Sequence, residues 1–499
     1  MYNVLEWLEQ SANLYSEKIA VIDEKSSLTY AELKEDSRCI GSALSGLVEM
    51  RTPVVVLADK GTDTLCLFFG SAYAGCFYVL LNPELPIVRL AQVQSVLEAE
   101  YIVTDKKYLD IARELVPEKR ILLIDDLKKH DIDDATLESI RNKAVDTDPI
   151  YANFTSGSTG IPKGVVVSHR SVIDFINVFT DTFSFEESDR IGNQAPFDFD
   201  VSVKDIYSAI KTGATLVIIP RHLFSKPVEL LDYICDHKIT VMTWAVSALC
   251  LISTFHGLDY RVPETVRKVL FSGEVMPYKH LKSWMEHLPE ATFVNVYGPT
   301  EITCNCTYHV IDRSRDYTDG VPIGKAFLNE HVFLLDENDK EITAEDEAGE
   351  ICVRGTALAL GYYRAKEQTD KHFVQNPLND RYIDMIYRTG DLGKYNVEGE
   401  INFCGRKDFQ IKHMGHRIEL EEVESAMAQI EGIERACCVF DEAKSKLYGF
   451  YVGDMDKKEL HIKMSEKLPI FMVPSALRKV EQMPLTKNGK IDRKALLIK

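Results

Sequence analysis

The segment Thr155-Ser-Gly-Ser-Thr-Gly-Ile-Pro-Lys-Gly164 combines glycines with small hydroxyl residues and leads directly into the apolar run Val165-Val-Val-Ser168. Such a run, bounded by turn residues, is typical of a buried strand in a parallel sheet. Glycine and small side chains let backbone N–H groups approach phosphate oxygens closely, and Lys163 adds a cation. The spacing differs from that of the Gly-x-x-x-x-Gly-Lys-Ser/Thr phosphate loop. Taken alone, the segment is compatible with a phosphate-binding loop or with a plain turn.

A strand–helix rhythm continues on both sides of this segment. Residues 54–58 and 101–104 are predicted to be buried strands, with an amphipathic helix over 89–98 between them. On the C-terminal side, the pattern predicts a helix over 203–210 and strands over 165–168, 215–220, 239–243, 268–271 and 292–296. Alternating strands and helices favour two α/β sheets flanked by helices. The polar run 128–148 lacks strong periodicity and is predicted to be a surface linker.

The C-terminal part of the chain has a different character. Beyond about residue 310, short β-branched segments with frequent glycine, such as Gly349-Glu-Ile-Cys-Val-Arg-Gly355, predict a small β-barrel. After Gly405-Arg-Lys-Asp408, strand and helix patterns alternate again. We therefore expect an α/β protein whose large N-terminal domain, residues 1–407, holds two α/β sheets and the small β-barrel. A small α+β C-terminal domain, residues 408–499, is expected to follow.

The composition excludes some classes of protein. The chain has 499 residues, of which 45% are hydrophobic and 27% charged, as in ordinary globular proteins. Its 58 Lys and Arg and 77 Asp and Glu give a net charge of −19, which argues against non-specific nucleic-acid binding. The 11 cysteines form no C-x-x-C pair, and neither Cys304-x-Cys306 nor Cys437-Cys438 has the spacing of a zinc site. We therefore expect buried free thiols and a cytoplasmic location.

One uncharged stretch, Thr64–Pro83, has to be weighed as a membrane span. Gly70 and Gly75 interrupt it, and it is only marginally long enough to cross a bilayer. The stretch is predicted to be a buried helix that turns into a buried strand, so no membrane span is expected. The N-terminus has neither a basic n-region nor a small-residue cleavage site, so no signal peptide is expected.

The motif Asn295-Val-Tyr-Gly-Pro-Thr-Glu301 contains residue types suited to a nucleotide. It follows a predicted strand, which is where α/β folds place ligands. Tyr297 can stack on a base, Thr300 offers a hydroxyl to a phosphate, and Glu301 is a hard oxygen donor suited to Mg²⁺. The alternative is a Gly-Pro turn with a surface glutamate.

Two motifs nearer the C-terminus offer a carboxylate and a lysine. In Tyr387-Arg-Thr-Gly-Asp-Leu392, the carboxylate of Asp391 can bind both ribose hydroxyls, unless the motif is a simple turn at a strand end. Asn488-Gly-Lys-Ile-Asp-Arg493 is a type of turn that would present Lys490, with a solvated lysine as the alternative.

Taken together and in this order, these motifs resemble the adenylate-forming superfamily of acyl-CoA synthetases, luciferases and peptide-synthetase adenylation domains. The resemblance covers almost the whole chain and extends to Leu28-Thr-Tyr-Ala-Glu-Leu33, Tyr73-Ala-Gly-Cys-Phe-Tyr-Val-Leu80, Gly349-Glu-Ile, Gly405–Leu420 and Leu468-Pro-Ile-Phe-Met-Val-Pro474. It is closest to amino-acid adenylation domains, especially the stand-alone D-alanine–carrier protein ligases. Pro196-Phe-Asp-Phe-Asp-Val-Ser-Val-Lys-Asp205 and Asp408-Phe-Gln-Ile-Lys412 carry that likeness.

The resemblance implies an ATP- and Mg²⁺-dependent ligase. It would convert a small amino acid into an aminoacyl-adenylate and pass the aminoacyl group to the phosphopantetheine thiol of a carrier protein. Lys490 would stabilise the charge that develops at the α-phosphate, together with Thr300 and with Mg²⁺ held by Glu301. Asp408 would be the hinge about which a mobile C-terminal lid rotates between the two reactions. The sequence carries no carrier-domain serine motif after Lys490, so the acceptor is expected in trans or in a longer synthetase.

The same resemblance assigns the nucleotide contacts. In the family, the glycine-rich loop handles the β- and γ-phosphates, and Asp391 and Arg406 hold the ribose. The full set implied is Thr155, Ser156, Gly157, Ser158, Thr159, Gly160, Lys163, Gly273, Glu274, Asn295, Val296, Tyr297, Gly298, Pro299, Thr300, Asp391, Phe403, Arg406 and Lys490.

The amino-acid pocket is assigned in the same way. Asp200 would pair with the α-ammonium group of the substrate, with a helix N-cap as the alternative. Lys204 stands where D-alanine ligases are expected to have an apolar residue, which favours an acidic or polar substrate side chain. The alternatives for Lys204 are that it reaches solvent or pairs with Asp200 or Asp205, and Ser272 in place of a bulkier residue also argues against D-alanine. The pocket residues implied are Asp200, Val201, Lys204, Thr243, Leu270, Ser272, Val296, Cys304 and Asn305.

Two other functions have to be weighed. An acyl- or aryl-CoA ligase of the same superfamily would not need a carboxylate at Asp200. A non-catalytic homologue that only binds nucleotide would not need Lys163, Glu301, Asp391, Arg406 and Lys490 together. The sequence therefore favours the amino acid–carrier protein ligase over both.

Overall fold

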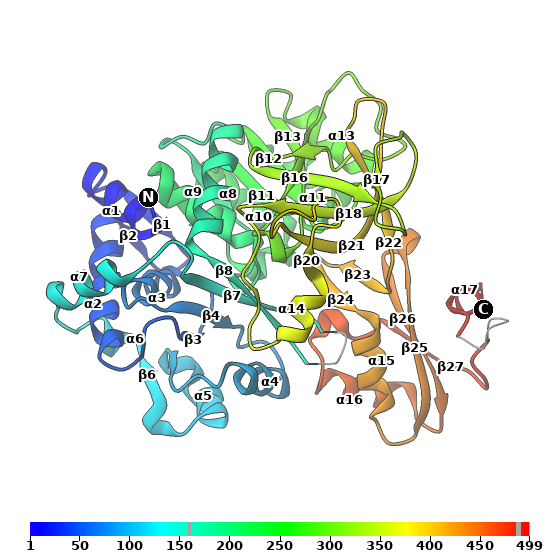
Figure 1. The fold of residues 1–499 in the computed structure, drawn as a ribbon, viewed down its shortest axis with the longest axis horizontal. Coiled ribbons are helices and arrows are strands. Elements are labelled where there is room, and N and C mark those ends of the chain that lie inside the picture. The colour runs from blue at the N-terminus through cyan, green and yellow to red at the C-terminus, as the bar shows by residue number, and fades with distance from the viewer. Residues whose placement is uncertain (158–160, 486–490, 499) are drawn as a thin grey trace. The chain divides into compact units, whose positions relative to one another are not determined.

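The computed structural model describes residues 1–157, 161–485 and 491–498. The candidate-site residues Ser158, Thr159, Gly160 and Lys490 lie outside these described residues. The chain folds into two compact units, whose elements are labelled in Figure 1. The first unit contains residues 1–81, 99–153 and 164–407, and the second contains residues 82–98, 154–163 and 408–499.

The larger sheet of the first unit has nine strands in the order β15-β14-β13-β12-β11-β9-β10-β1-β2. The run from β13 to β1 is parallel, and the remaining strands pair antiparallel at the two edges. The strands are β1 (Ile19–Ile22), β2 (Ser27–Thr29), β9 (Arg190–Asn193), β10 (Thr215–Ile218), β11 (Val241–Ala245), β12 (Lys268–Ser272), β13 (Thr292–Tyr297), β14 (Thr307–Val310) and β15 (Lys325–Ala326). The four strands predicted between residues 215 and 296 are confirmed as β10 to β13, with ends shifted by one or two residues.

The second sheet of this unit has seven strands in the order β19-β8-β7-β4-β3-β5-β6. They are β3 (Pro53–Leu57), β4 (Phe77–Leu81), β5 (Ile102–Thr104), β6 (Ile121–Leu123), β7 (Pro149–Thr155), β8 (Lys163–Ser168) and β19 (Gly361–Tyr362). The predicted strands at 54–58, 101–104 and 165–168 are confirmed as β3, β5 and β8. Every residue of β3 and β4 is buried, as expected for parallel strands covered on both faces.

Helices of the first unit connect and cover these strands (Figure 1). They are α1 (Leu5–Leu14), α2 (Tyr30–Ser45), α3 (Thr62–Tyr73), α5 (Leu109–Leu115), α6 (Ile124–Leu127), α7 (Asp134–Lys143), α8 (His169–Thr182), α9 (Val201–Thr212), α10 (Pro227–Asp236), α11 (Val246–Thr254), α12 (Gly257–Tyr260), α13 (Tyr278–His287) and α14 (Lys366–His372). The helix predicted over 203–210 is the interior of α9.

The uncharged stretch Thr64–Pro83 folds as expected. It contains most of α3 and then, after a turn, all of β4, and both elements are buried. Among the described residues, no helix is long and apolar enough to cross a membrane.

The predicted surface linker over residues 128–148 is wrong, because residues 134–143 form helix α7. The carboxylate of Asp133 caps the helix by accepting a hydrogen bond from the N–H of Thr136 at 3.0 Å. Leu137 is the buried side chain of this helix, so its apolar face is too narrow to produce a clear periodicity. Contacts with the remote helices α2 and α3 stabilise it instead.

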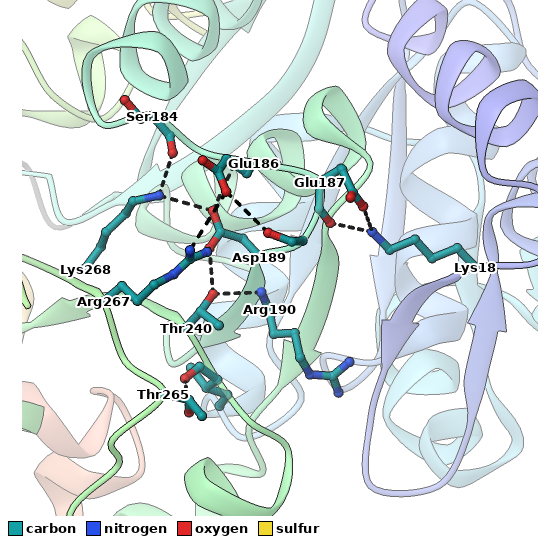
Figure 2. Close-up of polar contacts among 12 residues, drawn as sticks. Lys18, Ser184, Glu186, Glu187, Asp189, Arg190, Thr240, Thr265, Arg267 and Lys268 are labelled. Atoms are coloured by element: carbon teal, nitrogen blue, oxygen red, sulfur yellow. Dashed lines mark hydrogen bonds and ion pairs between the residues drawn. The ribbon is translucent and has the colours of Figure 1, made fainter.

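A buried carboxylate ties together the starts of three parallel strands of the nine-stranded sheet (Figure 2). Asp189, directly ahead of β9, accepts hydrogen bonds from the Thr240 hydroxyl at 2.7 Å and from Nη2 of Arg267 at 2.6 Å. Nζ of Lys268 lies 3.2 Å from its other oxygen, which also accepts from the N–H of Glu186. Burial alone would raise the pKa of Asp189, but these donors outweigh it and hold the pKa below its ordinary value.

The third sheet of the first unit is antiparallel and has six strands, five of them in the order β17-β16-β18-β21-β20 with β22 also paired to β21. It occupies the part of the chain where a small β-barrel was expected. Its strands are β16 (Glu330–Leu335), β17 (Glu341–Ile342), β18 (Gly349–Gly355), β20 (Phe373–Gln375), β21 (Met385–Tyr395) and β22 (Ile401–Arg406).

The second unit has its own α+β fold and its own apolar core. Its elements are α4 (Ile87–Leu97), the hairpin β23 (Gln410–His413) and β24 (His416–Glu419), α15 (Leu420–Ala428), β25 (Ile433–Asp441), β26 (Lys446–Gly453), α16 (Lys457–Ser465), β27 (Ala476–Lys479) and α17 (Arg493–Ile498). The predicted helix at 89–98 is confirmed as α4. The core includes Val423, Met427, Leu460 and Met464 from α15 and α16.

Candidate active site

Strand β13 ends at Tyr297, and the chain then turns sharply at Gly298. A Cβ atom at Gly298 would lie 2.5 Å from Cα of Asn305 and 2.7 Å from the carbonyl oxygen of Cys304, so a side chain there would collide with backbone. Thr303 and Cys304 have φ angles of 53° and 78°. This region costs a non-glycine residue roughly 1–3 kcal/mol, and such strain is concentrated at binding sites.

Glu301 lies in the single-turn helix Thr300–Ile302 and is fully buried, so the alternative of a surface glutamate is wrong. The hydroxyl of Tyr362 donates a hydrogen bond of 2.7 Å to its Oε1 atom. The backbone carbonyl of Glu301 accepts from the N–H of Ala359 at 2.9 Å. A hydroxyl donor and a backbone bond therefore fix the position of this carboxylate.

Two side chains hold the buried carboxylate of Asp391, on β21. The hydroxyl of Tyr297 donates to Oδ2 at 2.5 Å, and Nη1 of Arg406 donates to Oδ1. Burial, followed by the charge of Asp391, raises the pKa of Tyr297 far above its ordinary value, so its hydroxyl stays protonated and donates. Three residues that the resemblance assigns to the nucleotide thus lie together, although Tyr297 and Asp391 are 94 positions apart.

Asp200 stands directly ahead of α9, yet its carboxylate caps none of the described N–H groups of that helix. Asp200 thus occupies the N-cap position without making the capping hydrogen bond that the alternative required. Asp200 is 5% exposed, and the thiol of Cys304 donates to its backbone carbonyl at 3.1 Å. This contact places the start of α9 beside the strained turn that follows Glu301.

Lys204 is buried, with 1% of its surface exposed, so it does not reach solvent. Its Nζ atom donates to Oδ1 of Asn305 at 2.8 Å. Among the described residues it forms no ion pair with Asp200 or Asp205, so neither alternative proposed for this lysine holds. Burial lowers the pKa of Lys204, and nearby acidic groups, including Asp205 and Asp200, oppose that shift.

The sequence did not predict the contact between the side chains of Asp205 and Asn193. Nδ2 of Asn193 donates to Oδ2 of Asp205 at 2.8 Å, and the hydroxyl of Thr243 donates to Oδ1. Burial raises the pKa of Asp205 to about 7. Thr243, assigned to the pocket, therefore directs its hydroxyl at a protein carboxylate.

Lys60 is a second residue that sequence analysis missed. It follows β3, and its Nζ atom lies 3.1 Å from Oδ1 of Asn193 and 3.0 Å from the carbonyl oxygen of Gln194. These bonds hold the segment that leads to Asp200. Burial lowers the pKa of Lys60 to about 7. No local motif marks this lysine, since its partners are more than 130 positions away.

The other residues of the first unit that the resemblance assigns to the site are mostly buried or half-buried. Val201, Leu270, Ser272 and Val296 are buried. Asn295 is buried and donates through Nδ2 to the carbonyl of Pro322 at 2.8 Å. Gly273, Glu274 and Pro299 are half-buried in loops after β12 and β13, and Phe403 on β22 is 38% exposed.

The glycine-rich loop belongs to the second unit. Its Gly157 N–H donates to Oε2 of Glu422 at 3.1 Å, and Oγ of Ser156 donates to the carbonyl of Arg417 at 3.0 Å. A Cβ atom at Gly157 would lie 2.0 Å from the carbonyl oxygen of Ile161, so the turn requires glycine. Oγ1 of Thr155 is buried without a hydrogen-bond partner in the described part of the chain. Lys163, at the start of β8, is buried, and the expected hinge residue Asp408 is exposed.

Comparison with known proteins decides the family. Residues 8–363 match the family model of AMP-binding enzymes, and residues 422–490 match that of the AMP-binding enzyme C-terminal domain. The chain belongs to the AMP-binding enzymes. The adenylate-forming superfamily indicated by the motifs is thereby confirmed.

Three relatives show how far this similarity extends. Tyrocidine synthase 1 of Brevibacillus parabrevis is 29% identical over 503 residues, which cover 99% of this AMP-binding enzyme and 45% of that protein. Holo-PA1221, a nonribosomal peptide synthetase protein with adenylation and PCP domains, has a TM-score of 0.83 and 25% identity, covering 99% of this chain and 84% of that one. The o-succinylbenzoate CoA synthetase of Bacillus subtilis shares the fold, with a TM-score of 0.84, 20% identity, and 99% and 98% of the two chains covered. This AMP-binding enzyme spans less than half the length of the synthase.

The described residues of this AMP-binding enzyme fit a nucleotide and a divalent cation. The Oγ1 atom of Thr155, which has no partner among the described residues, suits a phosphate oxygen, because phosphate oxygens accept hydrogen bonds from hydroxyl groups. In the described chain, no cluster of three or more His, Cys, Asp or Glu side chains can hold a metal by itself. Mg²⁺ is commonly held by one or two carboxylates together with substrate phosphates, so the single buried carboxylate of Glu301 is a suitable protein ligand.

Proposed function

We propose that this AMP-binding enzyme activates an amino acid with ATP and Mg²⁺ and transfers it to the phosphopantetheine thiol of a carrier protein. The observation that carries the proposal is the contact between Cys304 and Asp200. Through it, a buried carboxylate suited to an α-ammonium group lies beside the turn that contains Thr300 and Glu301. A carboxylic acid without an amino group would not offer this buried carboxylate the ammonium group that it is suited to bind.

The reaction has two steps. A carboxylate oxygen of the amino acid attacks the α-phosphorus of ATP, the bond to the bridging oxygen breaks, and pyrophosphate leaves with an aminoacyl-adenylate formed. The carrier thiol, after losing its proton, then attacks the carbonyl carbon, forming a thioester and releasing AMP. Mg²⁺, when bound, neutralises charge on the phosphate oxygens.

Residues of this chain have separate roles in the proposal. Glu301 holds Mg²⁺ and Thr300 offers its hydroxyl to the α-phosphate, while Asp391, oriented by Tyr297 and Arg406, accepts hydrogen bonds from the ribose. Rotation of the C-terminal domain about Asp408 would bring Lys490 to the α-phosphate for adenylation and remove it for thioester formation.

The carrier is part of the proposal for two reasons. Tyrocidine synthase 1 is more than twice as long as the region that this chain matches, which leaves room there for further domains. PA1221 contains an adenylation domain and a PCP domain in one protein. The acceptor of this chain is accordingly a carrier domain, in trans or in a longer synthetase.

Amino-acid-dependent exchange of labelled pyrophosphate into ATP tests the first step. A set of amino acids is compared with the corresponding acids that lack the amino group, and then CoA and a phosphopantetheinylated carrier protein are offered as acceptors. We expect exchange with at least one amino acid and thioester formation on the carrier but not on CoA. Exchange driven only by acids without an amino group, or efficient acyl-CoA formation, would show that the chain is an acyl- or aryl-CoA ligase instead.

A further inference from the structure

Asp200 and Lys204 are four positions apart at the start of α9, so their side chains leave the same face of the helix. Residues so spaced have Cβ atoms about 5–6 Å apart. Both side chains are buried, with the residues 5% and 1% exposed. When Asp200 holds the ammonium group of a bound molecule, Lys204 can therefore reach a second group of that molecule only if the two groups are a few bonds apart.

The contact between Lys204 and Asn305 fixes the orientation of the Asn305 side-chain amide. An ammonium group can only donate hydrogen bonds, so the side-chain oxygen of Asn305 must face it, as the 2.8 Å contact shows. The amide nitrogen of Asn305 then points away with two N–H donors. Among the described residues, Nζ of Lys204 has Oδ1 of Asn305 as its one hydrogen-bond partner, and the amide nitrogen of Asn305 donates to no protein group.

Other groups near Lys204 are already engaged. Both oxygens of Asp205 accept hydrogen bonds, from Asn193 and Thr243. The thiol of Cys304 donates to the backbone of Asp200. Around Lys204, the hydrogen-bonding groups that remain available in the described chain are therefore all donors. They are two N–H groups of the Lys204 ammonium and two of the Asn305 amide. A buried ammonium whose hydrogen-bond partner among the described residues is a neutral amide calls for a further acceptor, preferably an anion.

We propose that the amino acid activated by this chain carries a carboxylate on a short side chain, as aspartate and glutamate do, and that Lys204 and Asn305 bind this carboxylate. The inference rests on the proposed function, because it assumes that Asp200 binds the α-ammonium group. An ionised carboxylate accepts hydrogen bonds and donates none, so it matches a surface made of donors. It also supplies the charge that a buried lysine requires. Val201, Leu270 and Val296, which the resemblance assigns to this pocket and which are all buried, would leave space for a short side chain only.

The test is pyrophosphate exchange with matched pairs of substrates. Aspartate is compared with asparagine, glutamate with glutamine, and alanine, in both stereoisomers, serves as the small apolar reference. We expect the better acidic substrate to exceed its own amide by roughly tenfold or more in kcat/KM, since a site built for a charged, hydrogen-bonded group rejects analogues that leave it unpaired. A higher kcat/KM for the amides or for alanine would overturn the inference and leave the proposed function intact.

Two variants separate recognition from folding. Asn305→Asp keeps the shape of the side chain but gives Lys204 an internal carboxylate, so acidic substrates should lose at least tenfold in kcat/KM while the amides gain relative to them. Lys204→Met keeps the length and removes the charge, so the preference should move from acidic to apolar amino acids. Lys211→Met, on the same helix but bonded to Asp181 and Thr180, should leave the order of substrates unchanged.

Each outcome has a distinct meaning. If Asn305→Asp and Lys204→Met kept the acidic preference in a folded protein, as judged by its melting temperature, the assignment of the carboxylate to these residues would be wrong. If the wild-type chain showed no exchange with any amino acid, the proposed function would fail first and the inference with it.

Discussion

The backbone N–H of Gly157, in the glycine-rich loop, donates a hydrogen bond to Oε2 of Glu422, whose Oε1 accepts from Nη1 of Arg89 at 2.5 Å. Both charged side chains are buried, with 3% and 9% of their surfaces exposed. Burial raises the pKa of Glu422, and the charge of Arg89 and the bonds it accepts oppose that shift. The N–H group of Gly157, which could otherwise donate to a phosphate oxygen, thus donates to the carboxylate of Glu422.

The first prediction concerns this buried pair. Glu422→Gln removes the charge and leaves the buried guanidinium of Arg89 without its anion, which typically costs 3–5 kcal/mol, so the free energy of unfolding of the second unit should fall by about that amount. Urea denaturation followed by circular dichroism measures it. Glu459→Gln, in the exposed pair with Lys463 of the same unit, is the control and should cost less than about 1 kcal/mol. Equal effects of the two substitutions would contradict the prediction.

The second prediction concerns the cation. Glu301→Gln keeps an oxygen for the hydroxyl of Tyr362 but removes the charge, so the pyrophosphate-exchange rate should fall roughly 100-fold or more, with a raised requirement for Mg²⁺. Exchange is measured against Mg²⁺ concentration. Tyr362→Phe, which removes only the supporting hydroxyl, should lower the rate by a smaller factor. Wild-type Mg²⁺ dependence in Glu301→Gln would exclude Glu301 as a ligand.

The third prediction concerns the ribose. Asp391→Asn places an amide opposite Arg406 and Tyr297, both of which donate to the native carboxylate. The KM for ATP should therefore rise by roughly tenfold or more, because a charge-assisted bond to a carboxylate is typically worth 1.5–3 kcal/mol. Initial rates at varied ATP with saturating amino acid measure it. Tyr297→Phe leaves the charge pair in place and should affect KM less, and the reverse order would refute the assignment.

The fourth prediction concerns stability and pH. The pKa of Asp189 is lowered in the folded chain, so its stabilising contribution is complete above its ordinary pKa of 3.8 and is lost as the pH falls through the lower folded-state value. Asp189→Asn should reduce the free energy of unfolding by about 2 kcal/mol at pH 7, and less in strong acid. Glu187→Gln removes the exposed pair with Lys18, drawn in Figure 2, and should cost under about 1 kcal/mol. A loss that did not shrink in acid would show that Asp189 acts through packing alone.

The fifth prediction concerns Lys490, which lies outside the described residues. Lys490→Ala should abolish adenylation while ATP still binds, because the lysine is proposed to act on the charge that develops during attack at the α-phosphate. Exchange assays and ATP binding by isothermal titration calorimetry are compared on the same preparation. Surviving exchange activity would remove Lys490 from the catalytic set.

Much of the fold could be predicted from local sequence. The apolar runs that became β3, β5, β8 and β10 to β13 are short and bounded by turn residues, and α9 is buried from Val201 to Ile210. By contrast, α7 was missed because its stability comes from the Asp133 cap and from remote helices rather than from a wide apolar face. A local sequence pattern therefore predicts those helices and strands whose own residues are apolar enough to indicate that they are buried.

The site shows the same division. The motifs singled out Asp200, Glu301 and Asp391, and all three are buried in the structure. The partner of Lys204 could not be predicted, since Asn305 is 101 positions away and local spacing suggested Asp200 or Asp205 instead. Hydrogen-bond partners that are far apart in the sequence cannot be predicted from the spacing of neighbouring residues.

The bond between the Cys304 thiol and the Asp200 carbonyl has a practical consequence for protein engineering. Substrate preference in such enzymes is a natural target for transplanting one stretch of sequence from a relative. Here the stretch 196–205 and the turn 298–305 are joined by this bond and by the Lys204–Asn305 contact, and Gly298 admits no side chain. A graft of one stretch alone would bring a donor without its acceptor, so the two have to be exchanged as a single cassette.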